Sequence, residues 1–518
     1  MPSVSDFIIE RMVNSGLHHV FGVPGDHVLG FFNKLSNADI EVIQTIQECD
    51  AVFAADAYAR IKGLGCACVS QHSALKVANA IACAYAERSP VLLISGAERS
   101  SYHQEVFRHF TCCSVSLDNP MLAGYAIDLM LEKMSYYKQP AFIELLQTVS
   151  DKPVVYDVYK QGTPSSPVSD LEILGEAVEE VVDWLNSAKY PVVLAGVQIA
   201  RCGLGVELLK FAERHNIPIV STILSKSVVD ESHPLFLGVY AGAGSGLKVQ
   251  QAIKDSDCLL MLGTSNGGGF NFIPKKKQSI FCSSDELRVK NHLYANSFGF
   301  EDFANALFKS KLCRVGLPSV IIEYKPKEFK PKAGVKITMA RLFEKINSVI
   351  GDNFVVVDVG DALLGSSELI VHHSHFVATA FYPSMGFAIP AALGVQVATK
   401  IRPIVIMGDA AFQMSCGELG TIVGRRLNPI IFVLNNGGYA TDFSFVNIQE
   451  WDFEKIVEVI GGGKSALVEE EQELQTAVTV AINHHDSPFV INVKIDPDDV
   501  SQVLCRIRKE KRVKYESI

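Results

Sequence analysis

The chain has 518 residues, too many for a single hydrophobic core, which predicts roughly two to four domains. Hydrophobic residues make up 48% and charged residues 20% of the sequence, a balance typical of folded globular proteins and not of disordered chains. The formal net charge of −10 argues against nucleic acid or an anionic membrane as the main partner. An anionic substrate would therefore need a local cation.

The first residues, Met1–Val13, combine charged side chains with apolar ones at helical spacing. This pattern is typical of an amphipathic helix and not of a signal peptide. No apolar run reaches the ~20 residues that cross a bilayer. The 12 cysteines form no paired CxxC motif, and several lie in apolar surroundings, as expected of reduced, buried thiols. We therefore expect a cytoplasmic protein with no membrane and no nucleic acid as partner.

Residues 1–160 alternate apolar strands with helices. A strand and turn are predicted at His19–Gly25, and an alanine-rich helix at Asp50–Arg60. Two further apolar strands are predicted at Pro90–Gly96 and Pro140–Leu145. Because these strands show no polar alternation, they indicate a parallel sheet covered by helices on both faces.

Two later segments have the composition of linkers, one at 161–167 and one at 323–334. The same alternation of strands and helices recurs between them and after the second. Strands are predicted at 191–196, 217–221, 258–263, 354–358, 403–407, 429–434 and 488–493. We therefore predict an α/β fold of three doubly wound parallel-sheet domains, at residues 1–160, 168–322 and 335–518.

The most informative motif of the third unit consists of two buried strands that each end in a polar oxygen. Ile404–Phe412 places Asp409 after the first strand, and Phe432–Tyr439 places Asn436 after the second. Ligands bind at the carboxyl edge of such sheets, and a helix predicted at Phe412–Leu427 directs its N-terminus there. A carboxylate and an amide oxygen suit a hard divalent cation such as Mg²⁺ that carries a diphosphate. In the alternative interpretation, both residues cap loops of an ordinary α/β domain.

These two segments resemble the cofactor motif of the thiamine-diphosphate-dependent enzymes, which opens with Gly-Asp-Gly and ends with Asn-Asn. The resemblance implies that thiamine diphosphate and Mg²⁺ are the cofactors. It implies that the metal is bound by Asp409, Asn436 and the carbonyl of Gly438. It also implies diphosphate contacts at Gly408, Asp409, Ala410 and Ala411. Ala410 replaces the second glycine of the motif, and we expect its methyl group to crowd the diphosphate.

The segment Gln47–Arg60 resembles the cofactor-activating segment of the same family. The resemblance implies that Glu48 bonds a ring nitrogen of the aminopyrimidine, and apolar neighbours are expected to raise its pKa. It further implies that Met385 is a wedge that bends the cofactor and that Asp361 lies near the aminopyrimidine. Two alternatives stay open: Glu48 as a plain charge at a helix N-terminus, and Met385 as ordinary core.

Across essentially the whole chain, the resemblance is strongest to the pyruvate and indolepyruvate decarboxylases. It is carried by the segments Phe21–Asp26, Ser232–Tyr240 and Asn447–Phe453. It implies addition of the thiamine ylid to a 2-oxo acid, loss of carbon dioxide, and release of an aldehyde after protonation. Asp26 would be a proton relay; the alternative is an ordinary turn aspartate after Pro-Gly.

Three features depart from that subgroup. Its adjacent histidine pair is missing, and of the separated His103 and His109 we favour His103 as the substitute. Its glycine-rich turn is replaced by Gln71-His72-Ser73, in which His72 is either a substitute proton donor or a structural loop residue. Asp442 stands where a catalytic glutamate is expected and is one methylene shorter, and a displacement of ~1 Å can cost ~100-fold in rate.

The resemblance and its three departures leave three candidate functions for the protein. The resemblance favours a 2-oxo-acid decarboxylase; the alternatives are a carboligase of acyloin or acetolactate type with the same cofactor, and a non-catalytic assembly or regulatory subunit. The missing histidine pair keeps the last one open. Glu48 argues against it, because a scaffold has no need of an activating glutamate. In the family, the segments that hold Glu48 and Asp409 meet across a subunit interface, which implies a homodimer or homotetramer.

Overall fold

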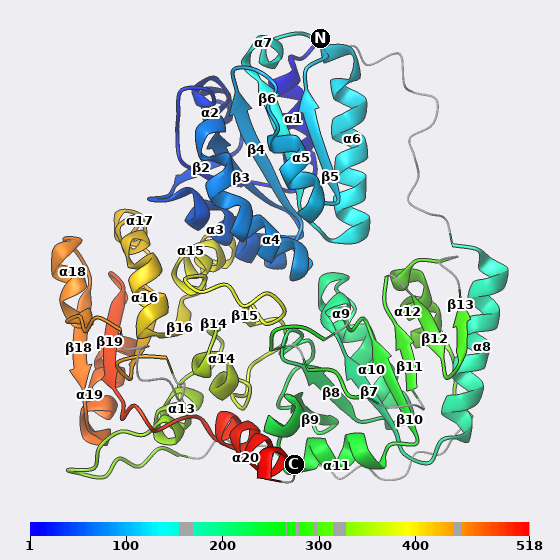
Figure 1. Cartoon of the computed structure of the whole chain (residues 1–518), viewed down its shortest axis with the longest axis vertical. Helices are drawn as coiled ribbons and strands as arrows, with labels where there is room; N and C mark the ends of the chain where they lie inside the picture. Colours follow the sequence, from blue (N-terminus) through cyan, green and yellow to red (C-terminus); the bar gives the residue numbers. More distant parts are fainter. Residues whose placement is uncertain are drawn as a thin grey trace.

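The computed structural model describes residues 1–154, 169–265, 267–270, 272–275, 279–284, 286–294, 298–313, 328–439 and 448–516, with side chains up to residue 510. These residues form three sheets, each with helices packed against it (Figure 1). The first domain lies above the other two in Figure 1, with the middle and third domains beside one another beneath it.

The first domain is built on a parallel sheet with the strand order β2-β1-β3-β4-β6-β5. Helices α1, α2 and α6 cover one face of this sheet, and α3 and α4 cover the other. The strands are β1 (His19–Gly22), β2 (Glu41–Gln44), β3 (Gly65–Ser70), β4 (Val91–Ala97), β5 (Cys113–Leu117) and β6 (Ala141–Leu146). The helices are α1 (Val4–Asn14), α2 (Leu29–Ser36), α3 (Glu48–Lys62), the 3₁₀ helix η1 (Gln71–Val77), α4 (Ala78–Ala86), α5 (His103–Phe107), the 3₁₀ helix η2 (Arg108–Phe110), α6 (Pro120–Tyr137) and α7 (Gln147–Ser150).

The middle domain has the strand order β13-β12-β11-β10-β7-β8-β9, with antiparallel pairs at its β12 and β13 edge. Helices α8, α9, α10 and α12 cover one face of its sheet, and α11 covers the other. The strands are β7 (Pro191–Ala195), β8 (Ile219–Thr222), β9 (Phe236–Tyr240), β10 (Cys258–Leu262), β11 (Ser279–Cys282), β12 (Leu287–Val289) and β13 (His292–Tyr294). The helices are α8 (Leu171–Ser187), α9 (Val197–Arg201), α10 (Gly205–His215), the 3₁₀ helix η3 (Gly242–Gly244), α11 (Leu247–Asp255) and α12 (Phe300–Lys309).

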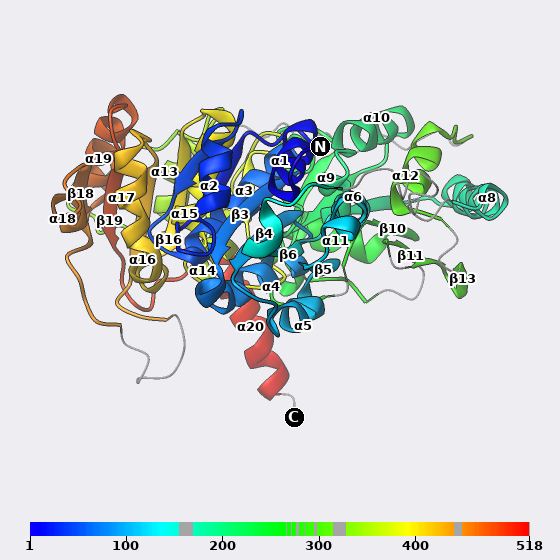
Figure 2. The same ribbon diagram turned by 90° about the horizontal axis from the view of Figure 1, so that it is seen from above.

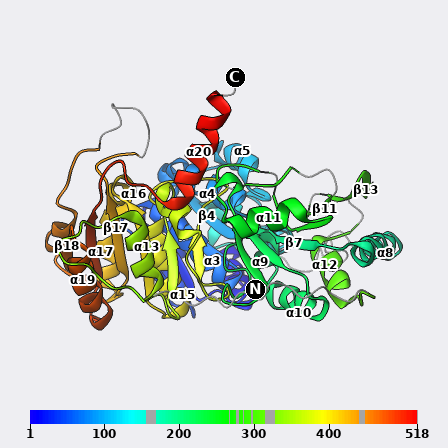
Figure 3. The same ribbon diagram turned by 90° about the horizontal axis from the view of Figure 1, so that it is seen from below.

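The third domain has a parallel sheet with the order β15-β14-β16-β17-β19-β18. Its strands are β14 (Phe354–Val357), β15 (Phe376–Ala378), β16 (Pro403–Gly408), β17 (Ile430–Asn435), β18 (Lys464–Val468) and β19 (Phe489–Lys494). Its helices are α13 (Met339–Asn347), α14 (Asp361–Ser366), α15 (Ala388–Thr399), α16 (Asp409–Ser415), the 3₁₀ helix η4 (Cys416–Glu418), α17 (Leu419–Gly424), the 3₁₀ helix η5 (Phe453–Lys455), α18 (Ile456–Val459), α19 (Glu471–Asn483) and α20 (Gln502–Glu516). Helix α20 projects away from the three sheets towards the C-terminus (Figures 2 and 3).

One apolar core joins the first and third domains. It contains the small residues of α3, almost the whole of α15 and the facing side chains of both sheets. The two helices approach so closely that a Cβ at Gly394 would overlap the carbonyl oxygen of Ala54. The small alanine side chains of α3 therefore allow the two domains to pack closely. This packing places the start of α3 beside the third domain.

The predicted α/β fold with three doubly wound sheets is confirmed, with the middle sheet mixed at one edge. The helix predicted from Phe412 instead begins at Asp409 and is interrupted by η4, in a segment where Gly417, Gly420 and Gly424 lower helix propensity. The domain boundaries stay proposals, because parts of both predicted linkers, 155–168 and 314–327, lie outside the described residues. Among the described helices, none combines the length and the apolar character that a membrane crossing requires.

Candidate active site

Two helices of the third domain begin at the carboxyl edge of its sheet. The chain passes from β14 to β15 on one side of β14, and then crosses to β16 on its other side. The topological switch point of the sheet therefore lies between β14 and β16. Helix α14 begins at Asp361 after β14, and α16 begins at Asp409 after β16. Asn436 follows β17, which pairs in parallel with β16. These three residues therefore share the edge where open α/β sheets bind ligands.

Backbone amides hold the carboxylate of Asp409 in place. Its Oδ1 accepts from the N–H of Ala410 at 2.7 Å, and its Oδ2 accepts from the N–H of Gly437 at 2.9 Å. Gly437 has a φ of 72°, which glycine adopts without strain, and this turn brings the loop after β17 to Asp409. Asp409 is 3% exposed, and burial raises its pKa although the backbone donors oppose the shift.

The oxygens of Asp409, Asn436 and Gly438 fit a magnesium site in their chemistry. In the described part of the chain, no three His, Cys, Asp or Glu side chains group as a metal site. A cation at Asp409 would thus rely on amide, carbonyl and ligand oxygens, which is the hard donor set that Mg²⁺ prefers. It would also offset the cost of burying the charge of Asp409. Ala410 and Ala411 are buried beside this carboxylate.

Asp361 binds the start of the C-terminal helix. Its Oδ2 accepts from the N–H of Ser501 at 2.7 Å, and its Oδ1 accepts from the Ser501 hydroxyl. Burial raises the pKa of Asp361, and the bonds from Ser501 oppose the shift. Both carboxylate oxygens are therefore engaged in holding α20, a role that the sequence analysis did not assign to Asp361.

The segment around Met385 is held from two domains. Asp358 is fully buried and accepts from the N–H groups of Gly386 at 3.2 Å and Ala388 at 2.9 Å. Asn79 of α4 donates to the hydroxyl of Ser384 at 2.8 Å. Burial raises the pKa of Asp358 to about 6, with the backbone donors opposing. Met385 itself is half-buried at the edge of the core shared by the two domains.

Two buried carboxylates near this segment carried no predicted role. One is Asp358, at the end of β14; the other is Glu87, whose Oε1 accepts from the N–H groups of residues 380, 381 and 382 at 2.9, 2.8 and 2.8 Å. Burial raises the pKa of Glu87, and the nearby Arg60 opposes this shift. An acidic residue at the end of an apolar strand was the available signal for Asp358. Glu87 follows an alanine-rich helix and had no such signal.

Glu48 is the first residue of α3, and its side chain is 13% exposed. Nζ of Lys76 lies 3.5 Å from Oε2 of Glu48, and the hydroxyl of Ser73 donates to the same carboxylate. Burial opposes ionisation, but the bond from Ser73, the backbone and the charge of Lys76 together lower the pKa of Glu48. The expected rise in pKa is therefore wrong for the chain as described, because polar side chains of η1 replace the apolar neighbours that were assumed.

The other predicted residues of the first domain lie at the carboxyl edge of its sheet. Asp26 follows β1 and is exposed; its backbone carbonyl accepts from Gln147 at 3.2 Å. His103 begins α5 after β4 and is 7% exposed, with Nδ1 buried and unbonded among the described residues. Burial lowers the pKa of His103, the charge of Glu144 opposes this, and the charge of His72 adds to it. Asp442 lies outside the described residues.

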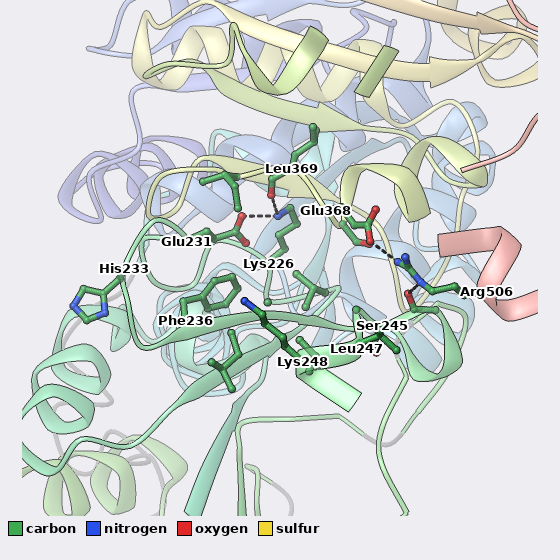
Figure 4. Close-up of a pocket in the computed structure, with 18 residues that line it drawn as sticks. Lys226, Glu231, His233, Phe236, Ser245, Leu247, Lys248, Glu368, Leu369 and Arg506 are labelled. Carbon is green, nitrogen blue, oxygen red and sulfur yellow. Dashed lines mark hydrogen bonds and ion pairs between the residues drawn. The ribbon is translucent and has the colours of Figure 1, made fainter. Parts of the chain in front are cut away.

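A separate cavity of about 470 Å³ lies between the middle domain, the end of α14 and α20 (Figure 4). Two of its cations are paired with carboxylates: Nζ of Lys226 lies 2.5 Å from Glu231, and Arg506 bonds Glu368. Among the described residues that line it, none was predicted for the cofactor or the substrate. The two groups of predicted residues therefore lie elsewhere, on the sheet edges of the first and third domains.

Three family models of thiamine pyrophosphate enzymes match the chain in order. The N-terminal TPP binding domain matches residues 2–114, the central domain matches 178–306, and the C-terminal TPP binding domain matches 358–493. The chain belongs to the thiamine pyrophosphate enzyme family, and its cofactors are thiamine diphosphate and Mg²⁺.

Individual relatives align over nearly the full length. A probable pyruvate decarboxylase of Schizosaccharomyces pombe is 28% identical over 97% of this chain and 94% of the relative. Pyruvate decarboxylase 1 of Pisum sativum is 27% identical over 96% and 91%, and the indole-3-pyruvate decarboxylase of Azospirillum brasilense is 26% identical over 98% of each chain. A solved putative thiamin diphosphate-dependent enzyme from Mycobacterium smegmatis has the same fold, with a TM-score of 0.77 at 20% identity over 96% of this chain and 99% of that one.

Proposed function

We propose that the protein converts a 2-oxo acid to an aldehyde and carbon dioxide. The observation that carries this proposal is Glu48 at the start of α3, in a chain that aligns nearly end to end with pyruvate and indolepyruvate decarboxylases. A carboxylate that can exchange a proton with the cofactor ring is needed for chemistry and not for binding alone. The binding residues Asp409 and Asn436 on the third domain support the same proposal.

Each group of residues has one task in this proposal. Asp409, Asn436 and the carbonyl of Gly438 bind Mg²⁺, while Gly408, Ala410 and Ala411 line the diphosphate. Thiamine diphosphate, when bound, supplies the nucleophilic carbon and the electron sink of the reaction. Glu48 holds or moves a proton at the ring nitrogen, and Met385 would pack against the cofactor. Asp26, His103 and Asp442 surround the substrate and handle its protons.

The two halves of the site lie on different domains, and we propose that a second subunit brings them together. The contacts between the first and third domains of one chain include the packing of α3 on α15, the bond of Asn79 to Ser384 and the bonds of Glu87 to residues 380–382. Glu48 is bonded instead to the polar side chains of η1. A homodimer or homotetramer, located in the cytoplasm, is therefore part of the proposal. Light scattering of the purified protein checks the oligomer, and a monomer that turns over would contradict it.

The deciding experiment measures carbon dioxide and aldehyde from a panel of 2-oxo acids. Each acid is tested with thiamine diphosphate and Mg²⁺, with either one omitted, and with Glu48→Gln as the matched variant. We expect carbon dioxide release that depends on both cofactors. Glu48→Gln should lose most of this activity, because glutamine keeps the size of the side chain and can still form hydrogen bonds but cannot exchange the proton. If no acid gives carbon dioxide while cofactor binding is demonstrated, the proposal fails. Acyloin in place of aldehyde would instead identify a carboligase.

A further inference from the structure

Two imidazole rings face each other at the carboxyl edge of the first sheet. Nε2 of His27 lies 3.4 Å from Nε2 of His72, with ring centroids 5.2 Å apart and ring planes at 60°. His27 is half-buried in the loop after β1, and His72 is exposed in η1 after β3. Two facing ring nitrogens can form this bond only when one carries a hydrogen and the other accepts it. The pair is therefore arranged to hold and pass one proton.

The backbone around the two rings is fixed by close packing. A Cβ at Gly25 would lie 2.7 Å from the Cβ of Ser70, and a Cβ at Gly96 would overlap the carbonyl oxygen of His27. The side chain of Gln71 bonds the backbone of the loop after β4 through both its nitrogen and its oxygen, at 3.0 and 3.3 Å. The ends of β1, β3 and β4 therefore hold the rings in place together.

This histidine pair connects the surroundings of two predicted site residues. His72 is followed by Ser73, whose hydroxyl donates to Glu48. His27 directly follows Asp26, the predicted relay residue. Each ring is therefore next in the chain to one of these groups: His27 to Asp26, and His72 to the residue that bonds Glu48.

We propose that His27 and His72 form a proton-relay pair that supplies the proton consumed in each turnover, an inference that rests on the proposed decarboxylation. When a 2-oxo acid anion becomes an aldehyde, the bond between the carboxylate carbon and the carbonyl carbon breaks, and carbon dioxide leaves. The electron pair of that bond stays with the former carbonyl carbon, which then takes up one proton. Imidazole is the side chain best suited to transfer protons near neutral pH. The exposed His72 is recharged from solvent, and the 3.4 Å contact passes the proton to His27.

A single-turnover experiment separates this role from substrate binding. Carbon dioxide and aldehyde are each quantified by rapid quench for the wild type, His27→Phe, His72→Gln and the double variant. His18→Gln is the control, since His18 is an exposed histidine of the same domain at the opposite end of β1. We expect the first release of carbon dioxide to stay within about twofold of wild type, and aldehyde formation to fall about 100-fold. The control should match wild type in both.

The double variant provides a second test. If the two rings act as one relay, its loss of aldehyde formation equals that of the more damaging single change and is not the product of both losses. The relay would be overturned if the loss of aldehyde formation in the double variant equalled the product of the two single losses. It would also be overturned if carbon dioxide release and aldehyde formation fell equally in the variants, or if His27→Phe and His72→Gln formed aldehyde at the normal rate. A wild type that releases no carbon dioxide would overturn the proposed function itself. The melting temperature and its rise with thiamine diphosphate and Mg²⁺ show that each variant is folded.

Discussion

Lys76 of η1 and Glu48 at the start of α3 form an ion pair, with Nζ 3.5 Å from Oε2. The lysine side chain is 67% exposed, whereas that of Glu48 is mostly buried. The pair therefore favours the ionised form of a carboxylate whose proposed task is to exchange a proton with the cofactor. Cofactor binding must compete with Lys76 for this side chain.

Lys76→Met should therefore raise the pKa of Glu48 towards its ordinary value and strengthen the binding of thiamine diphosphate. Exposed ion pairs contribute ~0.2–1 kcal/mol, so we expect affinity to rise about 1.4- to fivefold. Fluorescence titration with saturating Mg²⁺ measures the dissociation constant. Lys62→Met, at the opposite and exposed end of α3, is the control and should bind as wild type does. Weaker binding in Lys76→Met would mean that the lysine contacts the cofactor directly.

Asp409→Ala should abolish the dependence of cofactor binding on magnesium. The carboxylate is the only acidic member of the proposed Asp409, Asn436 and Gly438 ligand set, and we expect affinity to fall on the order of 100-fold. The measurement is the rise in melting temperature on adding thiamine diphosphate with Mg²⁺ or with EDTA. Asp486→Ala, an exposed change in the same domain, is the control. A magnesium-dependent rise equal to that of wild type in Asp409→Ala would refute the metal assignment.

The stability of the protein should fall as the pH rises from about 4 to about 8, because Asp50 and Glu418 share a buried site between the first and third domains. Burial and the neighbouring charge of Glu418 raise the pKa of Asp50 from 3.8 to about 8. Oδ2 of Asp50 and Oε1 of Glu418 have no other bonding partner in the described structure, so a shared proton is needed between them. The folded state then binds a proton that the unfolded state has lost, and unfolding becomes easier as the pH rises through this window.

Asp50→Asn should flatten this dependence, since the amide donates a hydrogen to Glu418 without needing a proton from solvent. We expect the variant to melt above wild type at pH 8 and close to it at pH 5. The melting temperature is measured across pH 5–9, with the exposed Asp118→Asn as control. A parallel slope for Asp50→Asn and wild type would exclude the pair as the cause.

Gly394→Ala should destabilise the packing of α3 on α15. A Cβ there would overlap the carbonyl oxygen of Ala54, and overpacking of a core costs ~1–3 kcal/mol. Gly175→Ala in the exposed face of α8 is the matched control, because a Cβ there meets no atom within 4 Å. The control should gain ~0.5–1 kcal/mol from helix propensity. The two melting temperatures should therefore move in opposite directions, and a neutral Gly394→Ala would show that the helices can separate slightly.

The residues that the sequence located best are those at the ends of apolar strands. Asp409 and Asn436 each follow a buried strand, and parallel pairing of β16 with β17 necessarily brings such residues to one edge. The start of α3 at Glu48 was also recognisable, from the alanine-rich run that follows it. In each case the information is local, because strand periodicity and helix composition are carried by neighbouring residues.

The side-chain partners of these residues could not be obtained in the same way. Glu48 meets Lys76, which is 28 residues away, and Asp361 binds Ser501, which is 140 residues away. The pKa of Glu48 was predicted in the wrong direction for this reason, since the charges around a group depend on which distant loops fold against it.

The three doubly wound sheets, the family and the strand ends that carry the proposed cofactor residues could all be predicted from the sequence, because periodicity, composition and short motifs are local properties of the chain. Only the folded chain shows that Asp361 holds α20, that Asp50 lies against Glu418 in a buried site, and that His27 faces His72. Those relationships join segments far apart in the chain. They depend on how whole helices and sheets pack, which no local pattern specifies.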